Sequence, residues 1–143
     1  MFRFALVLVG TLILVPSLAV AQQGDVTVAS LPPVVVKCVP QSGDVRVDPN
    51  TAEIRVTFSK RMADGSWSWS TVSPNTNPEI TGDPKYLADE KTCVLPVKLK
   101  PNQTYAFWLN SAKFGNFKDR KGHSAVPYLL VFQTRSNGKG NAK

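Results

Sequence analysis

The chain has little of the chemistry that builds metal centres. Its 143 residues include one histidine, His123, and two cysteines, Cys38 and Cys93. A structural zinc site uses about four His or Cys ligands, so a His-rich zinc site is excluded. The aspartates are scattered through turns, and none follows the spacing of a calcium-binding loop. The sequence therefore predicts no metal site and no cofactor.

Signs of catalysis are equally scarce. A serine nucleophile would need His123 as its base, and the chain has no Gly-x-Ser-x-Gly turn to present such a serine. No pattern of spacing places two carboxylates as the acid and base of a hydrolase. We therefore predict that the chain is not an enzyme.

Helical periodicity is also missing after the first segment of the chain. Short apolar stretches, several of them alternating, are instead separated by turn signals such as Asp48-Pro49-Asn50 and Asp64-Gly65. We expect strands near residues 34–39, 52–59, 67–70, 79–81, 92–99, 104–110 and 126–134. About seven short strands without helices predict an all-β fold, an antiparallel β-sandwich.

The first 21 residues have the three parts of a secretory signal peptide. Arg3 supplies a positive start, residues 4–15 are almost wholly apolar, and Ala19-Val20-Ala21 is a small-x-small cleavage pattern. A membrane anchor is the alternative, but a spanning helix needs about 20 apolar residues. We expect an exported protein, periplasmic or extracellular, with no stable membrane anchor after cleavage.

The remaining chain divides into three parts by composition. Residues 22–33 form a lead-in with few bulky apolar residues, which we expect to be flexible or extended. Residues 34–135 hold the predicted strands and form one domain. Residues 136–143 are a basic tail rich in Gly, Asn and Lys, for which we expect disorder.

Positive charge exceeds negative charge in the chain as a whole. The net charge is +7, and +6 once Arg3 leaves with the signal peptide. In an exported protein such a balance suits anionic envelope polymers, acidic glycans or membrane surfaces, and we expect no nucleic-acid partner. The alternative is that the charge only keeps the domain soluble.

Five ordered pieces of the chain resemble a known family. They are Val39-Pro40 with Gly43 and Val47-Asp48-Pro49; the strand and Phe-Ser of residues 54–62; Leu99-Lys100-Pro101-Asn102-Gln103-Thr104-Tyr105; Asp119-Arg120-Lys121-Gly122; and Phe132-Gln133-Thr134. Together they span residues 33–135 and resemble the bacterial Ig-like domain of the SbsA Ig-like family, first named from S-layer proteins. The resemblance implies an Ig-like β-sandwich that serves envelope proteins as a spacer, adhesive or accessory module, without shared catalytic residues.

The two cysteines are candidates for a disulfide. Cys38 has the parity of Val34 and Val36, and Cys93 that of Leu95, so both are expected to point inward. Export makes a bond chemically feasible. The alternative is two buried thiols.

Two groups of residues are candidates for binding. Trp67, Trp69 and Trp108 lie off the main core face or in irregular chain and are candidates for an apolar platform that contacts sugars or protein partners. The alternative is that these indoles cap the open end of the sandwich or fill a minor core. A loop near residues 111–124 combines cations with aromatic rings, namely Lys113, Phe114, Phe117, Lys118, Arg120 and Lys121. It would bind an anionic polymer, or is simply a solvated loop with its Phe side chains tucked under.

We therefore predict a non-catalytic, exported Ig-like module with a binding or structural role in the cell envelope. Its partner would be an envelope protein or a polysaccharide. A carbohydrate-binding module that uses exposed Trp residues is the alternative.

Overall fold

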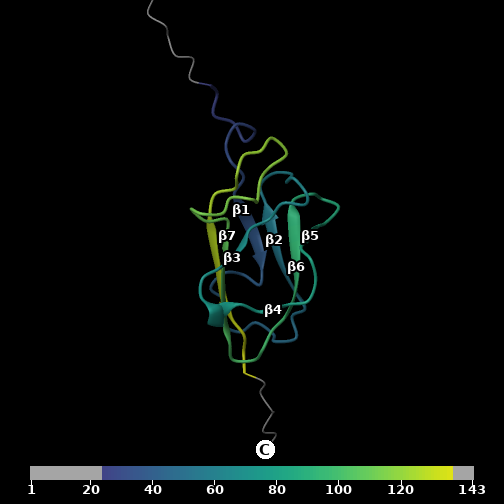
Figure 1. Ribbon diagram of the computed structural model, residues 1–143, viewed down its shortest axis with the longest axis vertical. Coiled ribbons are helices and arrows are strands. Elements are labelled where there is room, and N and C mark those ends of the chain that lie inside the picture. The colour runs from purple at the N-terminus through teal and green to yellow at the C-terminus, as the bar shows by residue number, and fades with distance from the viewer. Residues whose placement is uncertain (1–23, 137–143) are drawn as a thin grey trace, which may run out of the picture.

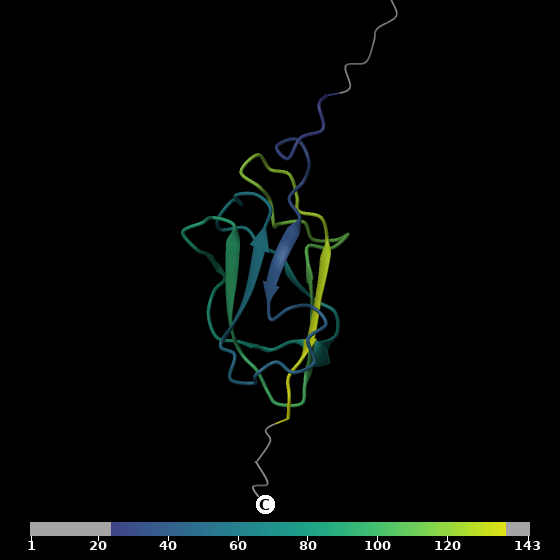
Figure 2. The same cartoon turned by 180° about the vertical axis from the view of Figure 1, so that it is seen from behind.

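Two antiparallel sheets pack face to face in the computed structural model, which describes residues 24–136 (Figures 1 and 2). The predicted all-β Ig-like sandwich is confirmed. The predicted signal peptide lies outside the described residues, as does the basic tail from residue 137 onward. Nothing in the described part of the chain forms a helix long and apolar enough to cross a membrane.

The strands divide between the sheets as in an Ig constant-type domain. One sheet has the order β1 (Val35–Val39), β2 (Glu53–Phe58), β6 (Thr92–Lys98) and β4 (Glu79–Ile80), with β5 (Lys85–Tyr86) also paired to β6. The other has the order β3 (Trp69–Thr71), β7 (Thr104–Leu109) and β8 (Tyr128–Gln133). A 3₁₀ turn, η1 (Pro74–Thr76), follows β3. In chain order this reproduces the A-B-E-D and C-F-G sheets of that class.

The core forms between the two inner faces, as the alternation of residues predicts. From β2 it receives Ile54, Val56 and Phe58, and from β7 it receives Tyr105, Phe107 and Leu109, none of them more than 3% exposed. Burial of these side chains is the main favourable contribution to folding. The period of two along each strand explains which residues contribute.

The first strand differs from its predicted alternation. The sequence suggests that Val34, Val36 and Cys38 share the inward face, but Val36 is 59% exposed while Cys38 is buried. The register with β2 shifts between Val35 and Lys37. This irregularity inserts one residue, which reverses the parity of everything before it.

Pro96 explains why two short strands, and not one long strand, border β6. β6 has neighbours on both sides, with β2 along one side and the two short strands along the other. The carbonyl of Pro96 accepts a hydrogen bond from the N–H of Thr81 at 3.1 Å, but proline has no N–H to donate in return. β5 pairs with residues before Pro96 and β4 with residues after it. Residues 81–84 therefore leave the sheet between them.

Several family-motif residues act as structural ties at the β6–β7 connection. The Tyr105 hydroxyl accepts a hydrogen bond from the N–H of Lys100 at 2.7 Å, which is the tyrosine-corner arrangement of Ig domains. The Thr134 hydroxyl donates to the carbonyl of Lys100 at 2.6 Å and accepts from the N–H of Gln103 at 2.9 Å. Asn102 between them takes the left-handed conformation, with φ of 53°. These bonds hold the last strand against the turn before β7.

Candidate functional site: a groove beside β3

A groove of about 660 Å³ opens at the free edge of β3. Its walls come from β3 and the chain before it, from β4 and residues 82–84, and from the loop that holds Phe114. Leu95, an inward-facing and buried residue of β6, also lines the groove. The groove therefore reaches the space between the two sheets, on the side where residues 81–84 have left β6.

Two of the three tryptophans line this groove, but as parts of its packed wall. Trp69 packs edge-on against Phe107 and Phe117, with ring centroids 6.0 Å and 5.7 Å away. Trp67 is half-buried and packs against the same core. Phe114 is 46% exposed, and the Lys113 ammonium lies 5.4 Å from its ring centroid, in range for a cation–π contact.

Trp108 lies elsewhere. It pairs with Ser70 on one side and Leu129 on the other, whereas Trp69 pairs with Leu109. Since neighbouring positions of a strand point to opposite faces, Trp108 projects from the outer face of this sheet, where it is 37% exposed. The structure thus brings Trp67 and Trp69 together and does not bring Trp108 to them.

The backbone of β3 is unpaired on the side that faces away from β7. The N–H of Asn110 donates to the carbonyl of Ser68 at 3.2 Å, so Ser68 and, two residues on, Ser70 direct their backbone groups to β7. Trp69 and Thr71 direct theirs the opposite way. Neither residue's backbone N–H or C=O forms a hydrogen bond there within residues 24–136.

A small polar cluster lies behind the groove wall. The indole N–H of Trp69 and the hydroxyl of Tyr86 are buried without a hydrogen-bond partner among the described residues. Burial raises the pKa of the neighbouring Cys93 thiol to about 12, although the Trp69 indole opposes this shift. Burial, followed by the charges of Cys93 and Asp64, also raises the pKa of Tyr86. A thiol with so high a pKa stays protonated at neutral pH and is a poor nucleophile.

Cys38 and Cys93 do not form the predicted disulfide. Both are free and buried, and both are paired with Val56, Cys38 from β1 and Cys93 from β6. Two strand spacings place their Cα atoms about 9.5 Å apart, whereas a disulfide requires less than about 7 Å. Burial raises the pKa of Cys38 to about 11, partly offset by a hydrogen bond with Tyr128. The alternative interpretation, two buried thiols, describes the structure.

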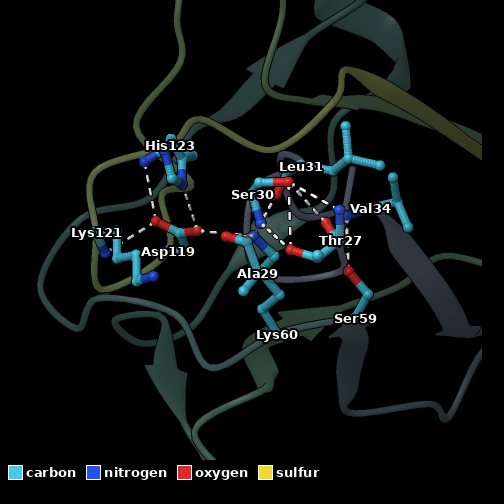
Figure 3. Close-up of polar contacts among 10 residues, drawn as sticks. All are labelled: Thr27, Ala29, Ser30, Leu31, Val34, Ser59, Lys60, Asp119, Lys121 and His123. Carbon is cyan, nitrogen blue, oxygen red and sulfur yellow. Dashed lines mark hydrogen bonds and ion pairs between the residues drawn. The ribbon is translucent and has the colours of Figure 1, made fainter. Parts of the chain in front are cut away.

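A second polar site joins the lead-in to the domain (Figure 3). The Lys60 ammonium donates to the carbonyls of Ala29, at 3.2 Å, and of Leu31. It also lies 3.2 Å from a carboxylate oxygen of Asp119. Both side chains are largely buried, so Lys60 links the turn at residues 27–31 to the loop that holds Asp119.

Asp119 organises that loop. Its carboxylate, 4% exposed, accepts hydrogen bonds at 2.9 Å from the N–H groups of Lys121 and His123 and lies 2.9 Å from Nδ1 of His123. Burial acts to raise its pKa, but the bonds from His123, Lys60 and Lys121 outweigh burial and hold the pKa well below its usual range. The Asp-x-x-Gly motif therefore closes a loop.

The cationic loop presents less free charge than its sequence suggests. Arg120 forms an ion pair with Glu90, which also lies 3.6 Å from Arg61. Lys118 is half-buried, and its backbone pairs with that of Ser124. Lys121 is exposed. Phe117 is fully buried and Phe114 is not, so only one of the two rings is tucked under.

His123 and Asp119 resemble the base and orienting acid of a hydrolase, but they lack a nucleophile. In the part of the chain that the structure describes, no serine hydroxyl or cysteine thiol forms a hydrogen bond with His123. The same residues contain no group of three His, Cys, Asp or Glu side chains arranged to hold a metal ion.

The free edge of β3 was not predicted from the sequence, nor were Ile80, Asp83 and Lys60 among the predicted site residues. The signal for the groove was Pro96 in the middle of a strand, since a missing N–H must face a gap. Lys60 carried no signal, because its partners are carbonyls 29 and 31 residues away in sequence and a carboxylate 59 residues away.

The strand order and the tyrosine corner together define an Ig constant-type β-sandwich. The chain belongs to the bacterial Ig-like domain family, whose family model matches residues 29–134.

Two solved structures are similar to this chain. One is the surface layer protein SbsC, domains 1-6, with a TM-score of 0.50 and 17% identity over 75% of this chain and 14% of that chain. The other is the S-layer protein rSbsC(31-844), with a TM-score of 0.48 and 16% identity over the same shares. This chain thus spans about one seventh of the length of the first, and at such identity the likeness concerns the fold alone. A search of curated proteins finds no match.

Proposed function

We propose that this protein is an exported, non-catalytic Ig-like module of the bacterial envelope that binds a partner in the groove beside β3. The observation that carries the proposal is the groove itself, about 660 Å³ lined by Trp67, Trp69, Ile80 and Phe114. Concave sites that combine aromatic walls with a few polar groups are the usual places for ligands. The partner is an envelope protein or a polysaccharide.

An envelope location is supported by two observations. The first 21 residues have the pattern of a secretory signal peptide, and the fold is shared with a surface layer protein. We further propose that the chain is of the SbsA Ig-like type. Its motif residues Tyr105, Asp119 and Thr134 all serve as structural ties, as expected of a family defined by its fold.

A non-catalytic role is supported by the chemistry of the described residues. The Cys93 thiol has a raised pKa, and the Asp119 carboxylate is engaged by Lys60 and His123. The Cys93 thiol is therefore a poor nucleophile at neutral pH, and the Asp119 carboxylate is already engaged in structural contacts.

A carbohydrate-binding module remains the second candidate, because Trp67 and Trp69 share one groove with Asn116 and Asp83. Amide and carboxylate groups beside aromatic rings suit sugar hydroxyls. Both indoles are packed against the core, however, which leaves them less ring face than an open platform offers.

A pull-down tests the proposal. Purified protein is incubated separately with outer-membrane proteins, peptidoglycan and envelope polysaccharide. We expect retention by one fraction, weakened in Trp67→Ala and unchanged in Trp108→Ala, the matched control on the opposite face. Circular dichroism checks that both variants stay folded. Equal retention of both folded variants, or no retention of the protein by any fraction, would contradict binding through the groove.

A further inference from the structure

The geometry points to an extended peptide as the ligand of this groove: we propose that a segment of a partner protein adds to β3 as a further strand of its sheet. This inference rests on the proposed function and names the class of partner. The unpaired backbone of β3, the space beside it and the charge of its lining each support it.

The unpaired backbone groups indicate where an added strand would pair with the sheet. Trp69 and Thr71 each direct an N–H and a C=O away from β7, along the free edge of the three-stranded sheet. These are the four groups with which an added strand would pair, and such pairing supplies affinity in strand-addition complexes. In Ig variable-type domains the same edge is occupied by an additional strand, so the position is compatible with the sandwich.

The space beside β3 is large enough for that strand. Residues 81–84 leave β6 at Pro96, and Gly82 packs on the proline ring so closely that a Cβ there would lie 3.3 Å from it. This withdrawal leaves the groove of about 660 Å³ between β3 and residues 82–84. Alternate side chains of an added strand would point into it, toward Leu95, Trp67 and Ile80.

The residues that line the groove also indicate which side chains a complementary peptide should carry. Asp83 is the one charged residue among the described residues that line the groove, in a chain whose net charge is +7. Uncharged polar residues and apolar side chains make up the rest of the lining, and the apolar ones include Ile80, which is 58% exposed. The complementary peptide has large apolar side chains at alternate positions and a Lys or Arg near Asp83.

The same observations favour a peptide over a sugar. A sugar ring stacks on an open aromatic face, whereas the rings of Trp67 and Trp69 pack against the core and Lys113 sits over Phe114. A sugar would also leave the backbone groups of Trp69 and Thr71 without regular partners. The short length of β3, three residues, limits non-specific pairing with other strands.

The probe is a synthetic heptapeptide selected against the protein from a random phage-displayed library. We expect selected sequences to alternate apolar side chains and to include a cation. Binding is measured by titration, and amide exchange of the ¹⁵N-labelled protein is followed by NMR. On binding, the amides of Trp69 and Thr71 should become protected from exchange, because they donate to the peptide.

Two N-methylated forms of the peptide provide the decisive control. One carries methyl groups on odd residues and the other on even residues, so only one form loses the N–H groups that face β3. We expect that form to bind at least about tenfold more weakly and the other to bind as before. Equal binding of both forms would overturn strand addition.

Variants of the protein complete the test. Thr71→Pro removes an edge N–H that no other described residue uses, and we expect a loss of about five- to tenfold in affinity. Asp83→Lys, an exposed change that does not touch the strands, should weaken a basic peptide about fivefold even if Thr71→Pro fails to fold. Trp108→Ala should have no effect.

The outcomes separate this inference from the proposed function. If chitohexaose shifts the indole signals of Trp67 and Trp69 and no selected peptide does, strand addition is wrong but binding in the groove stands. If no peptide, chitohexaose or envelope fraction changes any groove signal, both proposals fail.

Discussion

Cys38 of β1 and Cys93 of β6 are both paired with Val56 of β2, so a third strand separates the two thiols. Both cysteines are buried on the core side of the sheet. A sheet of this order can hold two inward cysteines on the same level and still keep them beyond bonding range, because strand spacing is fixed by the backbone hydrogen bonds. An oxidising compartment would therefore not by itself produce a disulfide here.

The thiols should be free but unreactive in the native protein. Burial raises their pKa values to about 11 and about 12, so at pH 8 both are protonated as well as inaccessible. Iodoacetamide should modify neither cysteine in the folded protein and both after denaturation without reductant. Mass spectrometry counts the labels. Absence of labelling in denaturant, followed by two labels after reduction, would instead reveal a disulfide.

The tyrosine corner should contribute measurably to stability. Tyr105→Phe leaves the N–H of Lys100 without its acceptor, and we expect a loss of about 1–2 kcal/mol in the free energy of unfolding. Tyr86→Phe is the matched control, since its buried hydroxyl has no partner within residues 24–136. That change should be neutral or slightly stabilising. Urea denaturation of the two variants compares them, and equal losses would contradict this role of Tyr105.

Asp119 should make stability fall in acid. Burial acts to raise its pKa, but the contacts with His123, Lys60 and Lys121 lower it below its unfolded value of about 4. A depressed folded pKa gives stability that is complete above the unfolded pKa and lost as pH falls toward the folded one. Urea midpoints should therefore drop below about pH 4. The Asp119→Asn variant should be less stable at pH 7 and should show less of this drop. The control variant Asp83→Asn, altered at an exposed residue, should behave as the unmodified protein.

Replacement of Trp69 and of Trp108 should lower the stability of the protein by different amounts. Trp69→Ala removes a ring that packs on Phe107 and Phe117 and should cost about 3 kcal/mol. Trp108→Ala removes a half-exposed ring from the outer face and should cost about 1 kcal/mol or less. Thermal unfolding followed by fluorescence or circular dichroism measures both. Similar costs for the two changes would contradict the different environments described here.

Alternation and turn chemistry were enough to predict most strands. Ile54, Val56 and Phe58 occupy the inward face of β2 as expected, because the period of two is a local property of an extended chain. The same rule failed for Val36, where a register shift against β2 changes the parity of the strand. A bulge depends on the partner strand, which lies far away in sequence.

The candidate site was predicted only in part. Two of the three proposed indoles, Trp67 and Trp69, lie together in the groove, while Trp108 faces the other way. The sequence of a strand does not by itself show which of its two faces the opposing sheet will cover. Ile80 and Asp83 reach the groove from a different sheet, through a gap that Pro96 opens.

By itself the sequence determined the all-β class, the family motifs and the inward residues of the regular strands, because these follow from local periodicity and turn residues. Tertiary structure alone decided that Val56 separates the cysteines, that Lys60 reaches Asp119 and the lead-in, and that the edge of β3 stays unpaired beside a groove. Each of these depends on which strands become neighbours. The packing of the whole sandwich decides which strands pair, and no single segment of the chain carries enough information to predict that pairing.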